Sequence, residues 1–129
     1  MGYRFLIVDD SATTRAVIKR TIGMCGIETE RITEAGNGRD ALAVLAVAKV
    51  DLVFLDLNMP EMGGMEVCAK VQADPRLAST PIVIVSSESM ESRIQQMKNQ
   101  GAKGYIKKPF TPEQIRNVIQ EVLEVRNAA

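Results

Sequence analysis

The chain has 129 residues, 46% of them hydrophobic and 25% charged, and its 16 basic residues balance its 16 acidic residues. This length and composition are typical of one soluble globular domain, so we predict a single domain over residues 1–129. The neutral charge argues against a nucleic-acid partner, and no apolar run approaches the length of a membrane span. We therefore expect a cytoplasmic monomer that binds neither nucleic acids nor membranes.

The sequence contains no histidine and only two cysteines. The absence of histidine excludes Ser-His or Cys-His catalysis, a histidine metal site and a phosphohistidine on this chain. Cys25 and Cys68 each lie in a helical apolar pattern, so we interpret both as reduced core thiols, with a disulfide as the alternative. The N-terminus enters a predicted strand within a few residues and lacks the layout of a signal peptide.

An alternation of apolar strand, turn and amphipathic helix repeats five times along the chain. The first predicted strand, residues 5–8, ends at Asp9 and Asp10 and is followed by a helix to about Met24. The inner face of this helix is predicted to consist of Val17, Ile18 and Ile22. A more polar segment at residues 31–35 is typical of an edge strand. The next helix places the following residues on one face: Ala41, Leu42, Leu45 and Ala48.

The third predicted strand, residues 52–55, is wholly apolar and runs directly into Asp56. Such a run is typical of a buried strand in a parallel sheet. The two glycines at positions 63 and 64 are expected to loosen the chain before a helix that ends at residues 74–75. The fourth strand, residues 81–85, is again apolar and ends at Ser86.

The helix after the fourth strand carries a narrow apolar stripe and ends near Gly101, which suits a C′ position. That stripe consists of Met90, Ile94 and Met97. We infer a weakly held helix with much exposed surface. A short fifth strand at residues 104–107 precedes Lys108, and Thr111 caps the last helix. The core stripe of that helix consists of Ile115, Val118, Ile119, Val122 and Leu123.

Strict alternation of strands and helices predicts an α/β fold with a parallel sheet and right-handed crossovers. The three apolar strands belong in the centre, and the polar second and short fifth strands at the edges. This gives a flavodoxin-like (βα)5 doubly wound sheet with strand order 2-1-3-4-5. Because the order reverses between the first and third strands, Asp9, Asp10 and Asp56 fall at the switch point, where ligands bind in such sheets.

Three carboxylates at one crevice repel one another. At about 4 Å, each like-charge pair costs on the order of 4 kcal/mol at an effective dielectric constant of about 20. Mg²⁺ suits an all-oxygen site of this kind, and Lys108 supplies one further positive charge. With a hydroxyl from Ser86 and Asp56 as nucleophile, the set suits phosphoryl transfer. The alternative is that the acids are caps and Lys108 is a surface lysine.

Four segments together resemble the receiver domains of bacterial two-component response regulators, of the CheY-like chemotaxis type. They are VDDS at residues 8–11, DLNMP at 56–60, VSSE at 85–88 and GYIKKPF at 104–110. The resemblance covers essentially the whole chain. It implies that Asp56 is the phosphoacceptor and that Asp10, Asp56 and the backbone carbonyl of Asn58 hold Mg²⁺, with Asp9 reaching the metal through water. Lys108 would contact the Asp56 carboxylate and then the phosphoryl group.

The resemblance also implies a two-state switch. Ser86 would turn to hydrogen-bond the phosphoryl oxygen and Tyr105 would move inward with it, although Tyr105 also suits plain edge packing. The Lys108–Pro109 bond is cis in this family. Ser86 stands where threonine is commoner, and Gly63 where many relatives have Asp. Asn58 and Glu88 match the chemotaxis pattern at positions that tune phosphoryl lifetime, so we expect a short-lived phosphoaspartate.

We therefore predict a single-domain response regulator that accepts a phosphoryl group from a histidine kinase, with a chemotaxis kinase as one candidate. It is not an enzyme beyond catalysing its own phosphorylation and dephosphorylation, and it would bind a downstream protein through its fourth helix, fifth strand and fifth helix. We expect no DNA-binding or enzymatic output domain after residues 126–129, and the alternatives are a phosphorelay intermediate or an excised domain of a longer regulator. A Mg²⁺-dependent phosphatase is a distant alternative, because it needs a second Asp where Asn58 stands. A flavodoxin shares the fold, but Asp9 and Asp10 would repel its FMN phosphate.

Overall fold

The computed structural model describes residues 2–87 and 89–128 of the chain. Its strands are β1 (Tyr3–Val8), β2 (Thr29–Ala35), β3 (Leu52–Asp56), β4 (Ile82–Ser86) and β5 (Gly104–Lys107). Its helices are α1 (Ala12–Met24), α2 (Gly38–Val47), α3 (Gly64–Ala73), α4 (Glu91–Asn99) and α5 (Pro112–Ala128). None of the helices in the described part of the chain is both long and apolar enough to span a bilayer.

The strands form one parallel sheet in the order β2-β1-β3-β4-β5, which confirms the predicted fold class. Every residue of β3 and β4 is buried, whereas β2 consists of half-buried and exposed positions apart from the buried Ala35. The apolar runs therefore occupy the centre of the sheet because they can be covered on both faces, and the polar strand lies at an edge.

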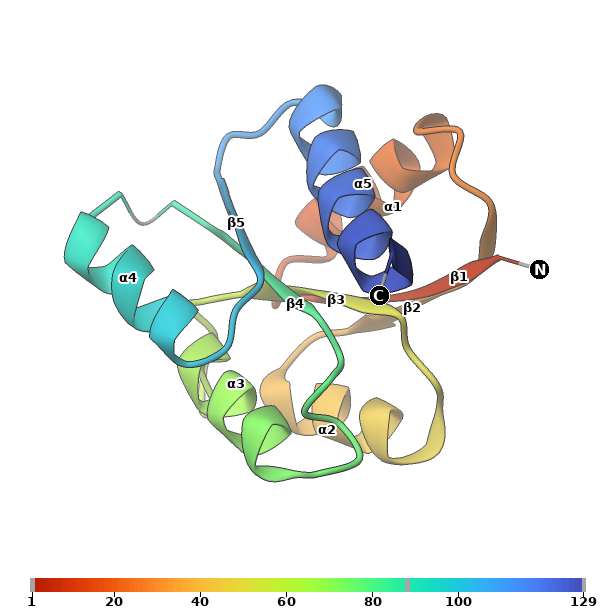
Figure 1. Cartoon of the computed structure of the whole chain (residues 1–129). Coiled ribbons are helices and arrows are strands. Elements are labelled where there is room, and N and C mark those ends of the chain that lie inside the picture. The colour runs from red at the N-terminus through yellow and green to blue at the C-terminus, as the bar shows by residue number, and fades with distance from the viewer. Residues whose placement is uncertain (1, 88, 129) are drawn as a thin grey trace.

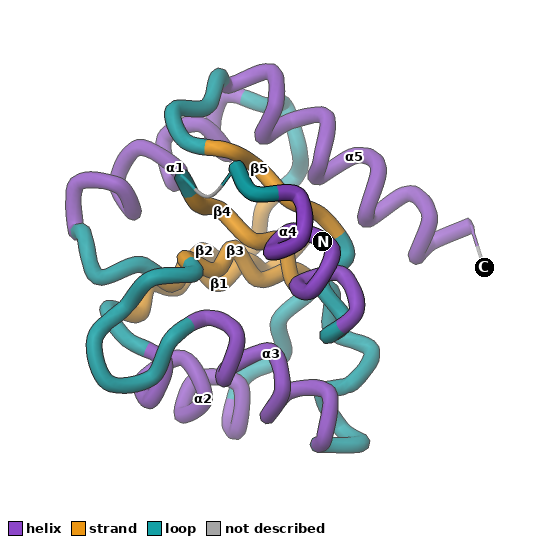
Figure 2. The backbone as a smooth tube through the Cα atoms, turned by 90° about the vertical axis from the view of Figure 1, so that its left-hand side faces the viewer, coloured by secondary structure: helices purple, strands orange, loops and turns teal. Residues whose placement is uncertain are grey.

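Helices cover both faces of the sheet (Figures 1 and 2). Figure 1 shows α1 and α5 on one side and α2 and α3 on the other. Side chains alternate along β1, so Phe5 and Ile7 pack under α1 and α5 while Leu6 and Val8 pack against α2 and α3. The sheet thus separates two hydrophobic cores, and the ends of its strands are free to carry polar groups.

Helix α4 lies beside β5 and next to α3 (Figure 1). It has a smaller buried face than the other helices. Met97 is its one buried residue and Ile94 is half-buried. Met90, predicted to belong to the apolar stripe, is instead the N-cap residue and is 62% exposed, because the helix begins one position later at Glu91. Gly101 follows the helix with φ +99°, as its predicted C′ role requires.

The inner face of α1 and the setting of Cys25 also differ from the predictions. Val17 was predicted on the inner face of α1 but is 47% exposed, and Thr21 is buried instead. The buried face of α1 is centred on Ile18, Thr21 and Ile22, which leaves Val17 just outside it. Cys25 is the half-buried C-cap of α1 rather than a core residue, whereas Cys68 is fully buried, and both thiols are free.

The glycines at positions 63 and 64 were predicted to loosen the chain, but the structure shows close packing at Gly64. Gly64 is the first residue of α3, and its amide donates to the carbonyl oxygen of Leu57 at 2.9 Å. A Cβ atom at Gly64 would overlap the carbonyl oxygen of Asp56. A glycine is therefore needed here for close approach, and it brings the start of α3 against the backbone of the acidic strand end.

Candidate functional site

The carboxyl ends of β1, β3, β4 and β5 meet at one edge of the sheet and carry the residues singled out from the sequence. Asp9 and Asp10 follow β1, Asp56 ends β3, Ser86 ends β4 and Lys108 follows β5. In a sheet of this order, β1 and β3 are neighbours whose connections leave toward opposite faces. The acids therefore converge at the crevice where such folds place ligands.

Asp9, Asp10 and Asp56 each offer a carboxylate oxygen, and these atoms all lie within 4.8 Å of one another. Asp9 is only 2% exposed, and its carboxylate accepts a hydrogen bond from the backbone N–H of Ser11 at 2.8 Å. Asp10 is exposed, so the cluster opens to solvent on its side. The arrangement is an acidic cluster with two buried members and one accessible member.

The Asp56 side chain is 8% exposed. Burial raises the pKa of its carboxyl group above the ordinary value, and the negative charge of Asp9 raises it further. The ammonium of Lys108 and the backbone N–H of Asn58 act in the opposite direction but do not cancel the rise. The surroundings of Asp56 therefore disfavour the charged form of its carboxyl group.

Lys108 is the cation of the cluster. Its Nζ donates to Oδ2 of Asp9 at 3.1 Å and lies 3.5 Å from Oδ1 of Asp56. Partial burial lowers the pKa of the ammonium, but the hydrogen bond to Asp9 and the charges of both acids outweigh burial and leave the pKa raised. Lys107, its neighbour in sequence, is exposed.

Ser86 and Tyr105 meet at the end of β4. Ser86 is completely buried, and its backbone carbonyl accepts from the amide of Lys108 at 2.8 Å and from the Tyr105 hydroxyl at 3.3 Å. Tyr105 is half-buried and packs against the core on the α2 and α3 side. The aromatic ring is therefore tied to the same strand end as the buried hydroxyl. The Lys108–Pro109 peptide bond beside them is cis.

Asn58, two residues past Asp56, is exposed at the mouth of the cluster. Glu88, the other residue expected to tune phosphoryl lifetime, lies outside the described residues.

The sequence reasoning missed Arg15. Its guanidinium Nη1 donates to the backbone carbonyl of Asp9, and its Nε donates to Oε1 of Glu34 at 3.0 Å. An arginine early in a helix after two acids carries no local signal, because the contact to β2 exists only once the sheet has formed.

The donor chemistry of the cluster suits a hard divalent cation. Three carboxylates offer oxygen ligands, and no thiol belongs to the group. Mg²⁺ prefers oxygen ligands and retains several waters, which the exposed side of Asp10 allows. The residues present therefore fit Mg²⁺, with two positive charges to offset the repulsion among the acids.

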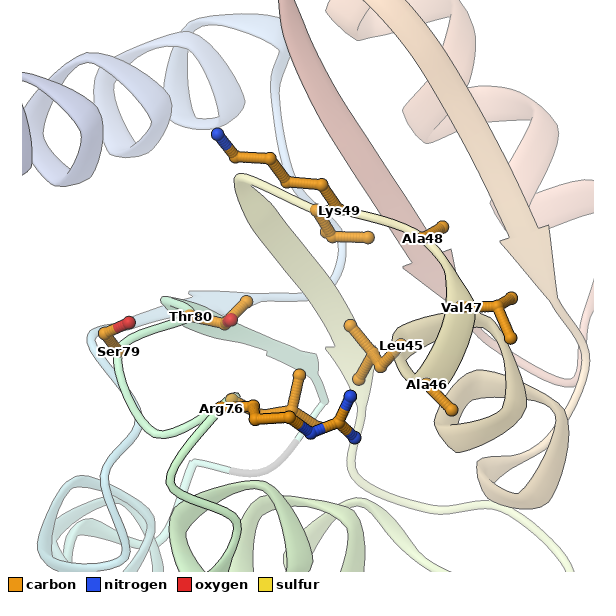
Figure 3. Close-up of a pocket in the computed structure, with 10 residues that line it drawn as sticks. Leu45, Ala46, Val47, Ala48, Lys49, Arg76, Ser79 and Thr80 are labelled. Carbon is orange, nitrogen blue, oxygen red and sulfur yellow. The ribbon is translucent and has the colours of Figure 1, made fainter.

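A hollow lies near the amino ends of β3 and β4, away from the acidic cluster (Figure 3). It measures about 410 Å³ and is bounded by the end of α2 and by the loop between α3 and β4. Leu45 contributes apolar surface, and Lys49 and Arg76 contribute charge. None of the residues that line it belongs to the acidic cluster, so the two features are separate.

Comparisons with known proteins agree with this geometry. Residues 5–120 match the model of the response regulator receiver domain. The chain is 36% identical to chemotaxis protein CheY1 of Helicobacter pylori, over 93% of this chain and 96% of that protein. It is 34% identical to chemotaxis protein CheY of Pseudomonas aeruginosa, over 94% and 96% of the two chains.

Among solved structures, chemotaxis response regulator CheY4 of Vibrio cholerae superposes with a TM-score of 0.84 at 34% identity, covering 95% of this chain and 99% of that one. The chain belongs to the response regulator receiver domain family, and its relatives are of the CheY type.

Proposed function

We propose that this protein is a single-domain response regulator in which Asp56 accepts a phosphoryl group and thereby switches the binding of a partner. The observation that carries the proposal is the convergence of a buried Asp56 with two further acids and the Lys108 ammonium at one strand edge. These four groups lie at the ends of three different strands, so they meet only because the chain folds. We infer that residues 1–129 act as one receiver domain in the cytoplasm, as a monomer.

The transfer step uses the Asp56 carboxylate as nucleophile. A carboxylate oxygen forms a bond to phosphorus, and the bond from phosphorus to the donor breaks, with its electron pair leaving on the donor. Since this chain has no histidine, the donor is a phosphohistidine on a partner kinase or a small acyl phosphate. Attack of water on the phosphoryl group reverses the modification and releases inorganic phosphate.

The other residues of the cluster handle charge. Asp10, Asp56 and the backbone carbonyl of Asn58 would hold Mg²⁺, with Asp9 acting through water. When bound, the metal would neutralise negative charge on the phosphoryl oxygens. Lys108, already beside both buried acids, can transfer its hydrogen bond to a phosphoryl oxygen. Three carboxylates, a divalent cation and one ammonium sum to zero charge.

Switching would begin at the end of β4. The Ser86 hydroxyl donates to the new phosphoryl group, and Tyr105 responds because its hydroxyl bonds the Ser86 carbonyl. Helix α4, which buries a single residue, is the element whose position such small shifts can change. We infer that a downstream protein binds the surface made by α4, β5 and α5.

A role in chemotaxis is supported by the CheY-type relatives. Asn58 and Glu88 would then favour a short lifetime of the phosphoaspartate. The competing role as a phosphorelay intermediate predicts rapid transfer onward to a histidine phosphotransfer protein. Binding of the phosphorylated form to a peptide from a flagellar switch protein, compared with such transfer, separates the two roles.

The direct test is the intact mass after incubation with a small acyl phosphate, with Mg²⁺ or with EDTA. We expect a gain of one phosphoryl group on the wild type in Mg²⁺ only, and none on Asp56→Asn. Asp40→Asn, which changes an exposed acid on α2, is the matched control and should be modified like the wild type. Absence of any gain under all conditions would overturn the phosphoacceptor role.

A further inference from the structure

Arg15 joins the first turn of α1 to two other parts of the fold. Its Nη1 donates to the backbone carbonyl of Asp9, and its Nε donates to Oε1 of Glu34 on β2 at 3.0 Å. The side chain is 19% exposed, so most of it is buried between these elements. A Cβ atom at Gly36 would lie 3.5 Å from Nη1, which places the guanidinium against the turn after β2.

The carbonyl that Arg15 binds belongs to the peptide between Asp9 and Asp10. The remaining groups of Asp9 are also fixed: its amide donates to the carbonyl of Ala35 at 3.1 Å, and its carboxylate binds Ser11 and Lys108. Asp10 has its exposed carboxylate on the other side of the same peptide. The orientation of this one peptide therefore sets the directions of two of the three acids.

We propose that Arg15 is a positioning residue for the acidic cluster, holding the Asp9–Asp10 peptide so that both carboxylates face the metal. Glu34 anchors the guanidinium from β2. The inference rests on the metal site of the proposed function. A planar guanidinium can bond the carbonyl and the carboxylate at once, whereas a lysine ammonium is a point charge without this fork.

Positioning and simple charge predict opposite results when Arg15 is removed. Arg15→Gln deletes a positive charge near the cluster and removes the guanidinium partner of Glu34, and by Coulomb's law both changes attract Mg²⁺ more strongly. If Arg15 orients the peptide, the same substitution weakens Mg²⁺ binding despite the more negative surroundings. The sign of the change thus distinguishes the two.

The experiment is a Mg²⁺ titration of the full chain followed by amide NMR shifts, with Arg15→Gln, Arg15→Lys and Lys19→Gln. Residues that orient metal ligands typically change affinity by about 10- to 100-fold, so we expect about a tenfold weaker Mg²⁺ affinity in both Arg15 variants. Lys19→Gln is the matched control. Lys19 lies one turn further along α1, 3.8 Å from the other oxygen of Glu34 and 53% exposed, and its loss should leave the affinity within about twofold.

A second readout is independent of the metal. In EDTA, backbone relaxation of the amides of residues 9–11 should show greater motion in Arg15→Gln than in the wild type or Lys19→Gln. Mg²⁺ affinity in Arg15→Gln equal to or tighter than wild type would overturn the positioning role. If the wild type itself binds no Mg²⁺, both the proposed metal site and the positioning role at that site fail. The measurement in EDTA still shows whether Arg15 orders the Asp9–Asp10 peptide. Should Arg15→Gln not fold, Arg15→Lys carries the comparison, because it keeps the positive charge and loses the planar fork, so charge alone predicts unchanged Mg²⁺ affinity and positioning predicts weaker binding.

Discussion

The ammonium nitrogen of Lys108 lies closer to Asp9 than to Asp56, at 3.1 Å against 3.5 Å. The single cation of the cluster is thus shared between two buried carboxylates. Both contacts keep the ammonium charged, since its pKa is raised despite partial burial. A phosphoryl group on Asp56 would offer oxygens that compete with Asp9 for this lysine, which gives the modification a direct means of altering the site.

Substitution of Lys108 tests this sharing. In Lys108→Gln, the buried acids lose their ammonium partner and a developing phosphoryl charge loses a stabilising donor, so we expect phosphorylation of Asp56 to slow by about tenfold or more. Lys107→Gln removes an adjacent but exposed lysine and should keep the wild-type rate. The measurement is the rate of mass gain with a small acyl phosphate in saturating Mg²⁺. Equal rates in the two variants would contradict the assignment of Lys108.

Repulsion among the acids should be visible in stability. In EDTA, Asp56→Asn removes a buried like charge, and we expect the free energy of unfolding to rise by about 1 kcal/mol or more, with Tm about 3–5 °C higher. Mg²⁺ should stabilise the wild type and have less effect on the variant, because a ligand stabilises only the state that binds it. Thermal unfolding with and without Mg²⁺ provides the measurement, with Glu121→Gln on the exposed side of α5 as control. A variant less stable than wild type in EDTA would count against the repulsion.

The two adjacent glycines before α3 should respond differently to alanine. A Cβ atom at Gly64 overlaps the Asp56 carbonyl, and backbone cannot move aside as a flexible side chain can, so Gly64→Ala should cost about 1–3 kcal/mol. At Gly63 the nearest atom, the Leu57 carbonyl oxygen, is 3.4 Å away, and Gly63→Ala should change stability by about 0.5 kcal/mol or less. Urea unfolding measures both. Equal effects would show that the close approach at Gly64 is not required.

Helix α4 should open more readily than α3. The two helices have 9 and 10 residues, but α4 buries one residue whereas α3 buries four. Local opening costs less where fewer apolar contacts are lost, so amides of α4 should exchange with deuterium faster than those of α3. Peptide-level hydrogen exchange in the unphosphorylated protein makes the comparison. Equal protection of the two helices would remove α4 as the preferred moving element.

The two thiols should differ in reactivity. Burial raises the pKa of Cys68 to about 11, so almost no thiolate exists at pH 8, and the side chain is also inaccessible. Because the folded-state pKa is above the unfolded value, folding stability associated with Cys68 is complete below pH 9 and declines as pH rises through about 11. Iodoacetamide at pH 8 should therefore label Cys25 before Cys68, as peptide mapping would show. Prior labelling of Cys68 in the folded protein would contradict its burial.

The apolar pattern of the sequence was enough to predict the sheet and the end of its strands at which the polar groups gather. Uninterrupted apolar runs can only be covered on both faces, which placed β1, β3 and β4 at the centre, and the end of each run fixed Asp9, Asp56 and Ser86 at one edge. The assignment of Lys108 rather than Lys107 rested on the family motif GYIKKPF, in which the lysine before the proline takes this role.

Contacts between separate elements followed only from tertiary packing. The periodicity of α1 located an apolar face but not its centre, which packing against α5 set at Ile18, Thr21 and Ile22, leaving Val17 exposed. Arg15 gained its partner Glu34 only because β1 and β2 pair, and Gly64 met the Asp56 carbonyl only where α3 folds back on the strand. Local patterns report which side chains avoid water, whereas distances between separate elements depend on how all of them pack together.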